Sequence, residues 1–264
     1  MACGTPHDMF SANPLWHNGP IPGGFYNFPG SKTAPLYSGA QRFHTPVTTG
    51  TSVLAIKCDG GVVIAADILG SYGSLARFRD LHRVHKINEN TVLGVSGDYA
   101  DFQHLQQIIE QKVISEQCLD DGFALKPRSL LCWLTRHLYY RRSRYDPLWT
   151  NFIVGGIQDG QPFLGTVDKL GTAYEDDHIA TGYGAYIALP VMRDELAKAK
   201  QSGQPISKED ACKVLERCMT VLFFRDARSF PKYEMITLTE EGYEHHGTKT
   251  VKANWEIAHM VKGY

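Results

Sequence analysis

The strongest candidate for chemistry in the sequence is a threonine that follows a glycine. Residues 47–53 read VTTGTSV, and Thr51 stands where a loose N-terminal segment gives way to an apolar strand pattern. A threonine hydroxyl attacks a peptide carbonyl when its own free α-amine serves as the base. This chemistry needs the Gly50–Thr51 bond to be cut, because an amide nitrogen inside a chain is not basic. The stretch belongs either to a self-processed threonine hydrolase or to a chain that only has the shape of one.

The composition is that of an ordinary globular protein. The chain has 264 residues, 43% of them hydrophobic and 21% charged, with a formal net charge of −1. A chain with so small a net charge has no positive electrostatic field that would attract the phosphates of a nucleic acid. We therefore expect no nucleic-acid partner. The basic run Arg141–Arg144 is interpreted as a solvated helix end. No transmembrane run or secretory leader is recognised, so we expect no membrane partner.

Cysteine and histidine spacing predicts neither a metal site nor another cofactor. Six cysteines are scattered without a CxxC pair, and three lie among apolar neighbours. We interpret them as reduced thiols in place of zinc ligands or disulfides, which favours the cytoplasm and nucleus. His245 and His246 are adjacent, and adjacent side chains on a strand point apart.

The N-terminal part of the chain differs from the rest. Residues 1–46 hold 7 of the 13 prolines, with glycines and aromatic residues between them and no helical or strand periodicity. We expect residues 1–42 to be a pro-segment or flexible arm that is trimmed. One domain is expected over 43–250, followed by a C-terminal tail over 251–264.

Hairpins and helices alternate through the predicted domain. Apolar, β-branched runs turn at Asp59-Gly60, Asp159-Gly160 and Glu241-Gly242, and a further strand is expected over 91–96. Apolar residues at three- and four-residue steps predict four helices. They are expected over 98–118, from Pro127, over 185–200 with Pro190 forcing a kink or a late start, and from Ser207 with a capping signal at Asp210.

This order of elements predicts the architecture. Helix pairs that alternate with hairpins do not make parallel βαβ units. The run Gly61–Asp67 is almost wholly apolar, so its strand needs cover on both faces. Two mostly antiparallel sheets stacked together, with helices outside each, meet both demands. We therefore predict an α/β (α+β) fold arranged as a four-layer αββα sandwich.

Several motifs, in sequence order, resemble those of a proteasome beta subunit. They are Gly61-Val-Val-Ile-Ala-Ala-Asp67, Val95-Ser-Gly-Asp-Tyr-Ala-Asp101 and Phe224-Arg-Asp-Ala-Arg-Ser229. The resemblance covers residues 47–264 and implies the N-terminal nucleophile hydrolase fold, which matches the four layers. It also implies that Thr51 occupies the nucleophile position, Gly97 the oxyanion-hole glycine, and Asp67, Asp226 and Ser229 the positions of further site residues.

Three positions depart from the active members of that family. The catalytic lysine position holds Arg83, which keeps the charge but cannot give up a proton. The position of a small serine holds Tyr183, whose ring we expect to fill space that substrate or water needs. Leu69 stands where active members carry a basic residue.

These departures predict a non-catalytic subunit with no catalytic residue. Its vestigial positions are Thr51, Asp67, Arg83, Tyr183, Asp226 and Ser229. Without catalysis, Asp67 is expected to form an ion pair with Arg83, and Asp226 to anchor a helix end. The alternative is an active threonine protease subunit that is self-processed at Gly50–Thr51.

The same resemblance implies partners. A non-catalytic member would fill one place in the beta ring of the 20S core particle and contact beta subunits of both rings, alpha-ring subunits and assembly chaperones. Trimming is expected at Arg42–Phe43, because a basic residue there suits a trypsin-like neighbour. From its residues alone, the tail either packs on its own domain or docks on a neighbour. The resemblance favours docking, through Trp255, Ile257, Met260 and Tyr264.

Overall fold

Tight turns at Asp-Gly dipeptides form two of the hairpins, as predicted. The computed structural model describes residues 45–260 except 123, 202 and 204, so the expected arm, Arg42–Phe43 and Tyr264 lie outside the described residues. Asp159 and Gly160 both have positive φ, 53° and 72°, in the turn between β8 (Thr150–Gln158) and β9 (Gln161–Val167). That geometry is the turn type that Asp-Gly favours. Gly60, with φ of 67°, turns β2 (Val53–Cys58) into β3 (Gly61–Asp67).

The strands form two sheets in which every ladder is antiparallel. The five-stranded sheet has the order β11-β2-β3-β12-β13. The eight-stranded sheet has the order β10-β9-β8-β7-β1-β4-β5, with β6 paired to β7. The remaining strands are β1 (Thr48–Gly50), β4 (Gly70–Tyr72), β5 (Leu75–Phe78), β6 (Val84–Asn88), β7 (Thr91–Asp98), β10 (Ala173–Glu175), β11 (His178–Ala180), β12 (Lys232–Thr239) and β13 (Gly242–Thr250).

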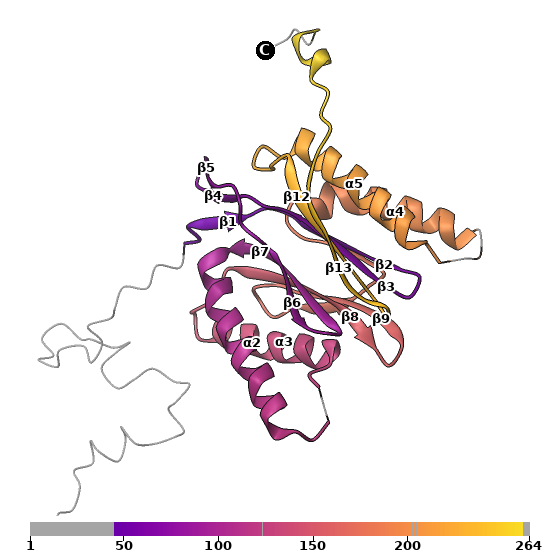
Figure 1. The fold of residues 1–264 in the computed structure, drawn as a ribbon. Coiled ribbons are helices and arrows are strands. Elements are labelled where there is room, and N and C mark those ends of the chain that lie inside the picture. The colour runs from indigo at the N-terminus through magenta and orange to yellow at the C-terminus, as the bar shows by residue number, and fades with distance from the viewer. Residues whose placement is uncertain (1–44, 123, 202, 204, 261–264) are drawn as a thin grey trace, which may run out of the picture. The chain divides into compact units, whose positions relative to one another are not determined.

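Helices cover the outer face of each sheet (Figure 1). Helices α2 (Tyr99–Leu119) and α3 (Pro127–Ser143) lie on the eight-stranded sheet, and α4 (Gly184–Gln201) and α5 (Lys208–Arg225) lie on the five-stranded sheet. The predicted four-layer αββα sandwich is therefore confirmed. Pro190 lies inside α4, which begins six residues earlier, so this proline does not delay the start of the helix.

The core between the two sheets depends on glycines, which have no side chain, as well as on large apolar residues. Every residue of β3 is buried, as expected for a strand covered on both faces. Ile64 is fully buried there. A Cβ at Gly94 would lie 2.8 Å from Cγ1 of Val53, and one at Gly155 would lie 3.0 Å from Cδ1 of Ile64. Glycine at both positions lets the sheets approach closely.

Side-chain caps fix where two of the helices begin. Asp98 caps α2 by accepting a hydrogen bond from the Ala100 N–H at 2.8 Å. Ser207 caps α5 by accepting one from the Asp210 N–H at 3.1 Å, in agreement with the capping signal in the sequence.

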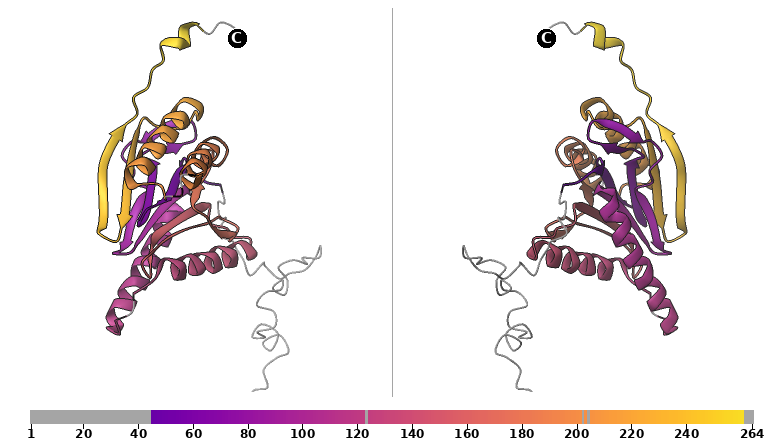
Figure 2. Two further views of the ribbon diagram at one scale, coloured as in Figure 1. Left: turned by 90° about the vertical axis from the view of Figure 1, so that its right-hand side faces the viewer. Right: turned by 90° about the vertical axis from the view of Figure 1, so that its left-hand side faces the viewer.

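Beyond β13 the chain continues into a short 3₁₀ helix, η2 (Glu256–Met260), and Figure 2 shows this yellow segment running on past the sheets.

The inter-sheet core generates a stability prediction. We expect Ile64→Ala to lower the free energy of unfolding by about 2–5 kcal/mol, because the lost methyl groups leave a cavity between the sheets. Ile114→Ala removes the same atoms from a side chain on α2 that is 56% exposed. We expect this control substitution to change the free energy of unfolding by less than about 0.5 kcal/mol. Urea unfolding of the two variants measures both values, and equal losses would contradict the assigned core.

Candidate functional site

The fold brings Thr51, Asp67 and Arg83 together, although 32 residues separate the first from the last. Thr51 lies between β1 and β2, Asp67 ends β3, and Arg83 immediately precedes β6. The Thr51 hydroxyl donates to Oδ2 of Asp67 at 2.5 Å and accepts from Nη2 of Arg83 at 3.2 Å. Asp67 and Arg83 are each only 1% exposed. The three side chains thus form one cluster at the junction of the two sheets.

The guanidinium of Arg83 finds acceptors for all of its nitrogens. Nε donates to the Asp67 carbonyl at 2.9 Å, and Nη1 donates to the carbonyls of Thr51 and Val95 at 2.8 and 3.2 Å. Nη2 reaches the Ser52 carbonyl at 3.2 Å and forms an ion pair with Oδ1 of Asp67. A buried charge is tolerated when it is paired and its remaining donors are bonded. The arginine therefore acts as a fixed, multiply bonded clamp.

Two opposing effects act on the Asp67 carboxyl group. Burial raises its pKa, and the positive charge of Arg83 and the Thr51 hydroxyl oppose that rise by favouring the carboxylate. The Phe230 N–H also donates to Oδ2, at 3.3 Å. The charge on Asp67 is thus tied to the presence of Arg83. Arginine keeps its proton throughout the accessible pH range, so this cluster contains no group that exchanges protons with Thr51 as a lysine would.

The residues just before Thr51 form a strand of their own. β1 lies between β4 and β7, with Gly50 opposite Gly70 on one side and opposite Gly97 on the other. The Val47 N–H donates to Oδ2 of Asp98 at 2.7 Å, which fixes the start of the strand to the cap of α2. Gly97, the expected oxyanion-hole glycine, therefore faces a segment of this chain. The strand position beside Thr51 is filled.

Gly50 has a packing role that its sequence context does not reveal. A Cβ at this position would lie 2.7 Å from Cδ and 2.9 Å from Nη1 of Arg83. Both atoms belong to a side chain fixed by six acceptors, so it could not move aside cheaply. Glycine is required here by the arginine, whether or not the bond that follows is ever cut.

Asp226 and Ser229 form a turn at the end of α5. Asp226 is the C-cap of the helix, and its Oδ1 accepts from the Arg228 N–H at 2.9 Å. Ser229 donates its hydroxyl to the Asp226 carbonyl at 2.7 Å. Neither side chain is hydrogen-bonded to Thr51, although both line the small cavity next to it. The space there that a water molecule can occupy is about 10 Å³, and one water needs roughly 10–15 Å³.

The expectation that the Tyr183 ring fills this centre is wrong. The ring is 64% exposed and does not line the cavity. Gly182, with φ of 59°, turns the chain, and the Gly184 N–H donates to Oγ of Ser52 at 2.8 Å, so the loop reaches the centre through its backbone. The space is closed by Met219, Leu222 and Phe230, which sequence reasoning missed. Leu69 is buried, at 3% exposed.

Glu234 holds Arg83 in place and was also missed. Its Oε1 accepts from the backbone N–H groups of Arg83 and Val84 at 2.6 and 2.9 Å, and its Oε2 lies 2.9 Å from Nδ1 of His82. Nε2 of His245 lies 3.7 Å from the same oxygen. The sequence does hold a signal that could have revealed Glu234: it is the one acidic residue in the otherwise largely apolar strand KYEMITLT. An acidic side chain that is buried in a strand requires hydrogen-bond or charge partners.

The described residues hold no metal-binding cluster, no membrane-spanning helix and no disulfide. No three histidine, cysteine or acidic side chains there are grouped so that they could hold a metal ion. No helix in residues 45–260, gaps aside, has the length and apolar character needed to span a membrane. The five cysteines in this part of the chain are free, and Cys118 and Cys132 are exposed.

The clamp generates a prediction about stability. Arg83→Met leaves the Asp67 carboxylate buried without its counter-ion, and we expect the free energy of unfolding to fall by about 3–5 kcal/mol. Adding Asp67→Leu to that variant should recover part of the loss, because the uncompensated charge is removed. Arg79→Met, at an exposed arginine nearby, should change it by less than about 0.5 kcal/mol. Urea unfolding measures these free energies. If the losses caused by Arg83→Met and by Asp67→Leu simply add in the double variant, the coupling between Arg83 and Asp67 is contradicted.

The contact between His82 and Glu234 generates a prediction about pH. The hydrogen bond to Glu234 raises the pKa of His82 above its usual value. The contact between protonated His82 and Glu234 therefore contributes fully to the free energy of unfolding below about pH 6.5. This contribution is lost as the pH rises through the raised pKa of His82. We expect the urea midpoint of the wild type to exceed that of His82→Gln most in acid, with the gap narrowing as the pH rises. A constant gap would rule out this linkage.

Comparison with known proteins identifies the family. The model of the proteasome subunit family matches residues 47–238. The chain is 50% identical over 248 residues to proteasome subunit beta type-4 of Xenopus laevis, covering 93% of this chain and 98% of that protein. It is 42% identical over 265 residues to beta type-4 of Drosophila melanogaster (96% and 97% covered) and 38% identical over 219 residues to that of Arabidopsis thaliana (83% and 87%). The chain therefore belongs to the proteasome subunit family, as a beta-type member.

Proposed function

We propose that this chain is a non-catalytic, structural subunit of the beta ring of the 20S proteasome core, a complex that degrades intracellular proteins. The observation that carries the proposal is the Arg83 clamp on Thr51 and Asp67. Kinship with beta type-4 subunits supports it. The work of the chain is then to complete a ring in which other subunits hold the active threonines.

Two features of the site support the absence of catalysis. The Thr51 hydroxyl directs its hydrogen to Asp67 and accepts one from Arg83. The group that replaces the family's lysine cannot release a proton. Each feature alone would slow the chemistry. In the uncut chain the strand Thr48–Gly50 also occupies the sheet position beside Thr51, between β4 and β7, and the Thr51 nitrogen is an amide that cannot serve as the base.

The tail supports a role in assembly. The Trp255 ring packs edge-on against Phe224 and Phe223, with ring centroids 4.9 and 6.1 Å apart, yet it stays 51% exposed. Met260 is 69% exposed. The tail thus rests partly on its own domain and leaves apolar surface open, which fits docking on a neighbouring subunit, with the opposite ring as the proposed place.

Further parts of the proposal follow from membership of the ring. The partners are beta subunits of both rings and alpha-ring subunits, with chaperones during assembly, in the cytoplasm and nucleus. Trimming at Arg42–Phe43 leaves β1 in place, because the cut lies upstream of Val47. A mature chain made in this way keeps Thr51 inside a peptide bond.

The intact mass of the mature chain in the native particle tests the proposal. We expect an N-terminus upstream of Val47 and no labelling of Thr51 by a threonine-directed electrophile. Thr51→Ala should leave the peptidase activities of the particle within about twofold of the wild type, because this hydroxyl takes no part in turnover. A mature chain that starts at Thr51 would establish the alternative, a self-processed protease.

A further inference from the structure

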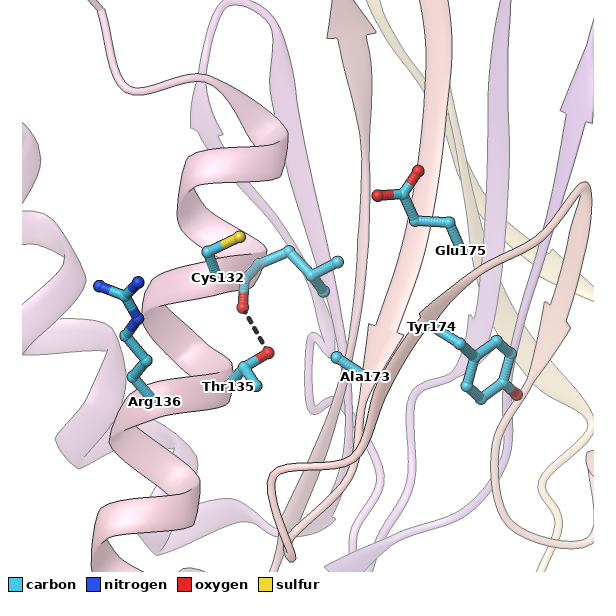
Figure 3. Close-up of a pocket in the computed structure, with 7 residues that line it drawn as sticks. Cys132, Thr135, Arg136, Ala173, Tyr174 and Glu175 are labelled. Atoms are coloured by element: carbon cyan, nitrogen blue, oxygen red, sulfur yellow. Dashed lines mark hydrogen bonds between the residues drawn. The ribbon is translucent and has the colours of Figure 1, made fainter.

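A conformational response to pH requires a titratable group whose partners the fold holds in place. The groove between α3 and β10 has no buried group of this kind (Figure 3). Its titratable lining is exposed and consists of Cys132, Arg136, Tyr174 and Glu175. Glu234 is the opposite case, because its side chain is 1% exposed and meets histidines from two other segments of the chain.

One oxygen of Glu234 lies between those two histidines. Oε1 is taken by the backbone N–H groups of Arg83 and Val84, which leaves Oε2 to the histidines. Nδ1 of His82 lies 2.9 Å from Oε2, and Nε2 of His245 lies 3.7 Å from it. His82 precedes β6 and His245 belongs to β13. The shared oxygen therefore links the segment that leads into β6 to the edge strand of the five-stranded sheet.

His245 also holds a bulge in β13. The register of β13 against β12 shifts between Glu234 and Ile236, because β13 has one residue more than β12 in this stretch. Gly247 lies in the bulge with φ of 71°, and its N–H donates to Nδ1 of His245 at 3.0 Å. The bulge thus depends on a histidine nitrogen that accepts a hydrogen bond.

That hydrogen bond fixes where the neutral His245 ring carries its proton. A backbone N–H only donates, so Nδ1 must be an unprotonated acceptor. The proton is then on Nε2, which faces Oε2 of Glu234. A second proton enters at Nδ1, and the cation no longer accepts a hydrogen bond from Gly247. Protonation of His245 therefore removes the contact that holds the bulge.

Other titratable groups surround Glu234 on each neighbouring element. Burial lowers the pKa of His85 in β6, which favours its neutral ring. Burial and the charge of Glu234 raise the pKa of Tyr99 in α2 and that of Tyr243 in β13, so both phenols keep their protons. Further charged side chains here are Asp80, Lys86 and Glu110. The two histidines at Oε2 remain as the pair that changes charge between about pH 8 and pH 5.

We propose that Glu234 and its two histidines form a pH-operated latch on the edge strand β13. As the pH falls, His82, the nearer ring, binds Oε2 as a cation and holds the segment before β6. Further acid protonates His245, which loses its bond to Gly247 and meets an oxygen that is already occupied. The bulge then opens and releases the end of β13, residues 248–250, from which the C-terminal tail departs. The latch belongs to this chain alone and does not rest on the proposed function.

Amide hydrogen exchange at Gly247 tests the latch. In the wild-type full-length chain, we expect its protection factor to fall about fivefold or more between about pH 8 and pH 5, because a hydrogen bond is lost. His245→Gln keeps an acceptor for the Gly247 N–H but cannot be protonated, and should abolish the fall. His246→Gln changes the adjacent histidine of the same strand and should preserve it. Constant protection at Ile64 shows that the core stays folded.

A substitution at the other histidine tests the shared oxygen. His82→Gln removes the cation that competes for Oε2, so a protonated His245 gains the whole carboxylate. We expect Gly247 to lose its protection at a pH that is higher than in the wild type by at least about 0.3. His104→Gln changes an exposed histidine of α2 and should leave that pH unchanged.

Four results would overturn the latch. They are a Gly247 protection factor that does not depend on pH, a fall that persists in His245→Gln, a parallel loss at Ile64, and an unchanged pH of release in His82→Gln. The first three deny that His245 controls the bulge, and the last denies that the histidines share one oxygen. None of them bears on the proposed function, which the N-terminus of the mature chain decides.

Discussion

The contact between the Arg83 guanidinium and the Asp67 carboxylate fixes the geometry of the whole centre. Asp67 ends a strand of the five-stranded sheet, while the Val95 carbonyl that the same guanidinium reaches belongs to the eight-stranded sheet. One side chain thus joins both sheets at the point where they meet. A charge buried this deeply must have every donor satisfied, so its neighbours are constrained in turn. Glu234 holds the backbone of the arginine, and Gly50 leaves room for its side chain.

The same residue positions support either a proton relay or a static clamp. A lysine presents one ammonium group that rotates and exchanges protons. An arginine presents a planar fork whose donors point in set directions and keep their protons. In this chain the fork bonds the Thr51 carbonyl as well as its hydroxyl, so the threonine is held from two sides. Its hydroxyl is one of several acceptors that a buried cation requires, and the centre contributes to stability in place of turnover.

Local patterns in the sequence were enough to predict most elements and the four layers. Asp59-Gly60 and the periodic helices are determined by neighbouring residues, and the strand Gly61–Asp67 shows its two covered faces in its composition. The cluster of Thr51, Asp67 and Arg83 was accessible through family resemblance. The orientation of the Tyr183 ring could not be predicted in this way. It is decided by the positive φ at Gly182 and by the hydrogen bond from the Gly184 N–H to Oγ of Ser52. Glu234 escaped notice because its partners are about 150 residues away in sequence.

The closeness of Gly50 to Arg83 has an evolutionary consequence. Once an arginine occupies the lysine position, selection for packing maintains the glycine even where selection for self-cleavage has ceased. The order of substitutions then matters, since a larger residue at position 50 is admissible only after the arginine is gone. The two residues thus become mutually dependent, and a Gly-Thr dipeptide beside such an arginine can persist without marking a site of self-cleavage.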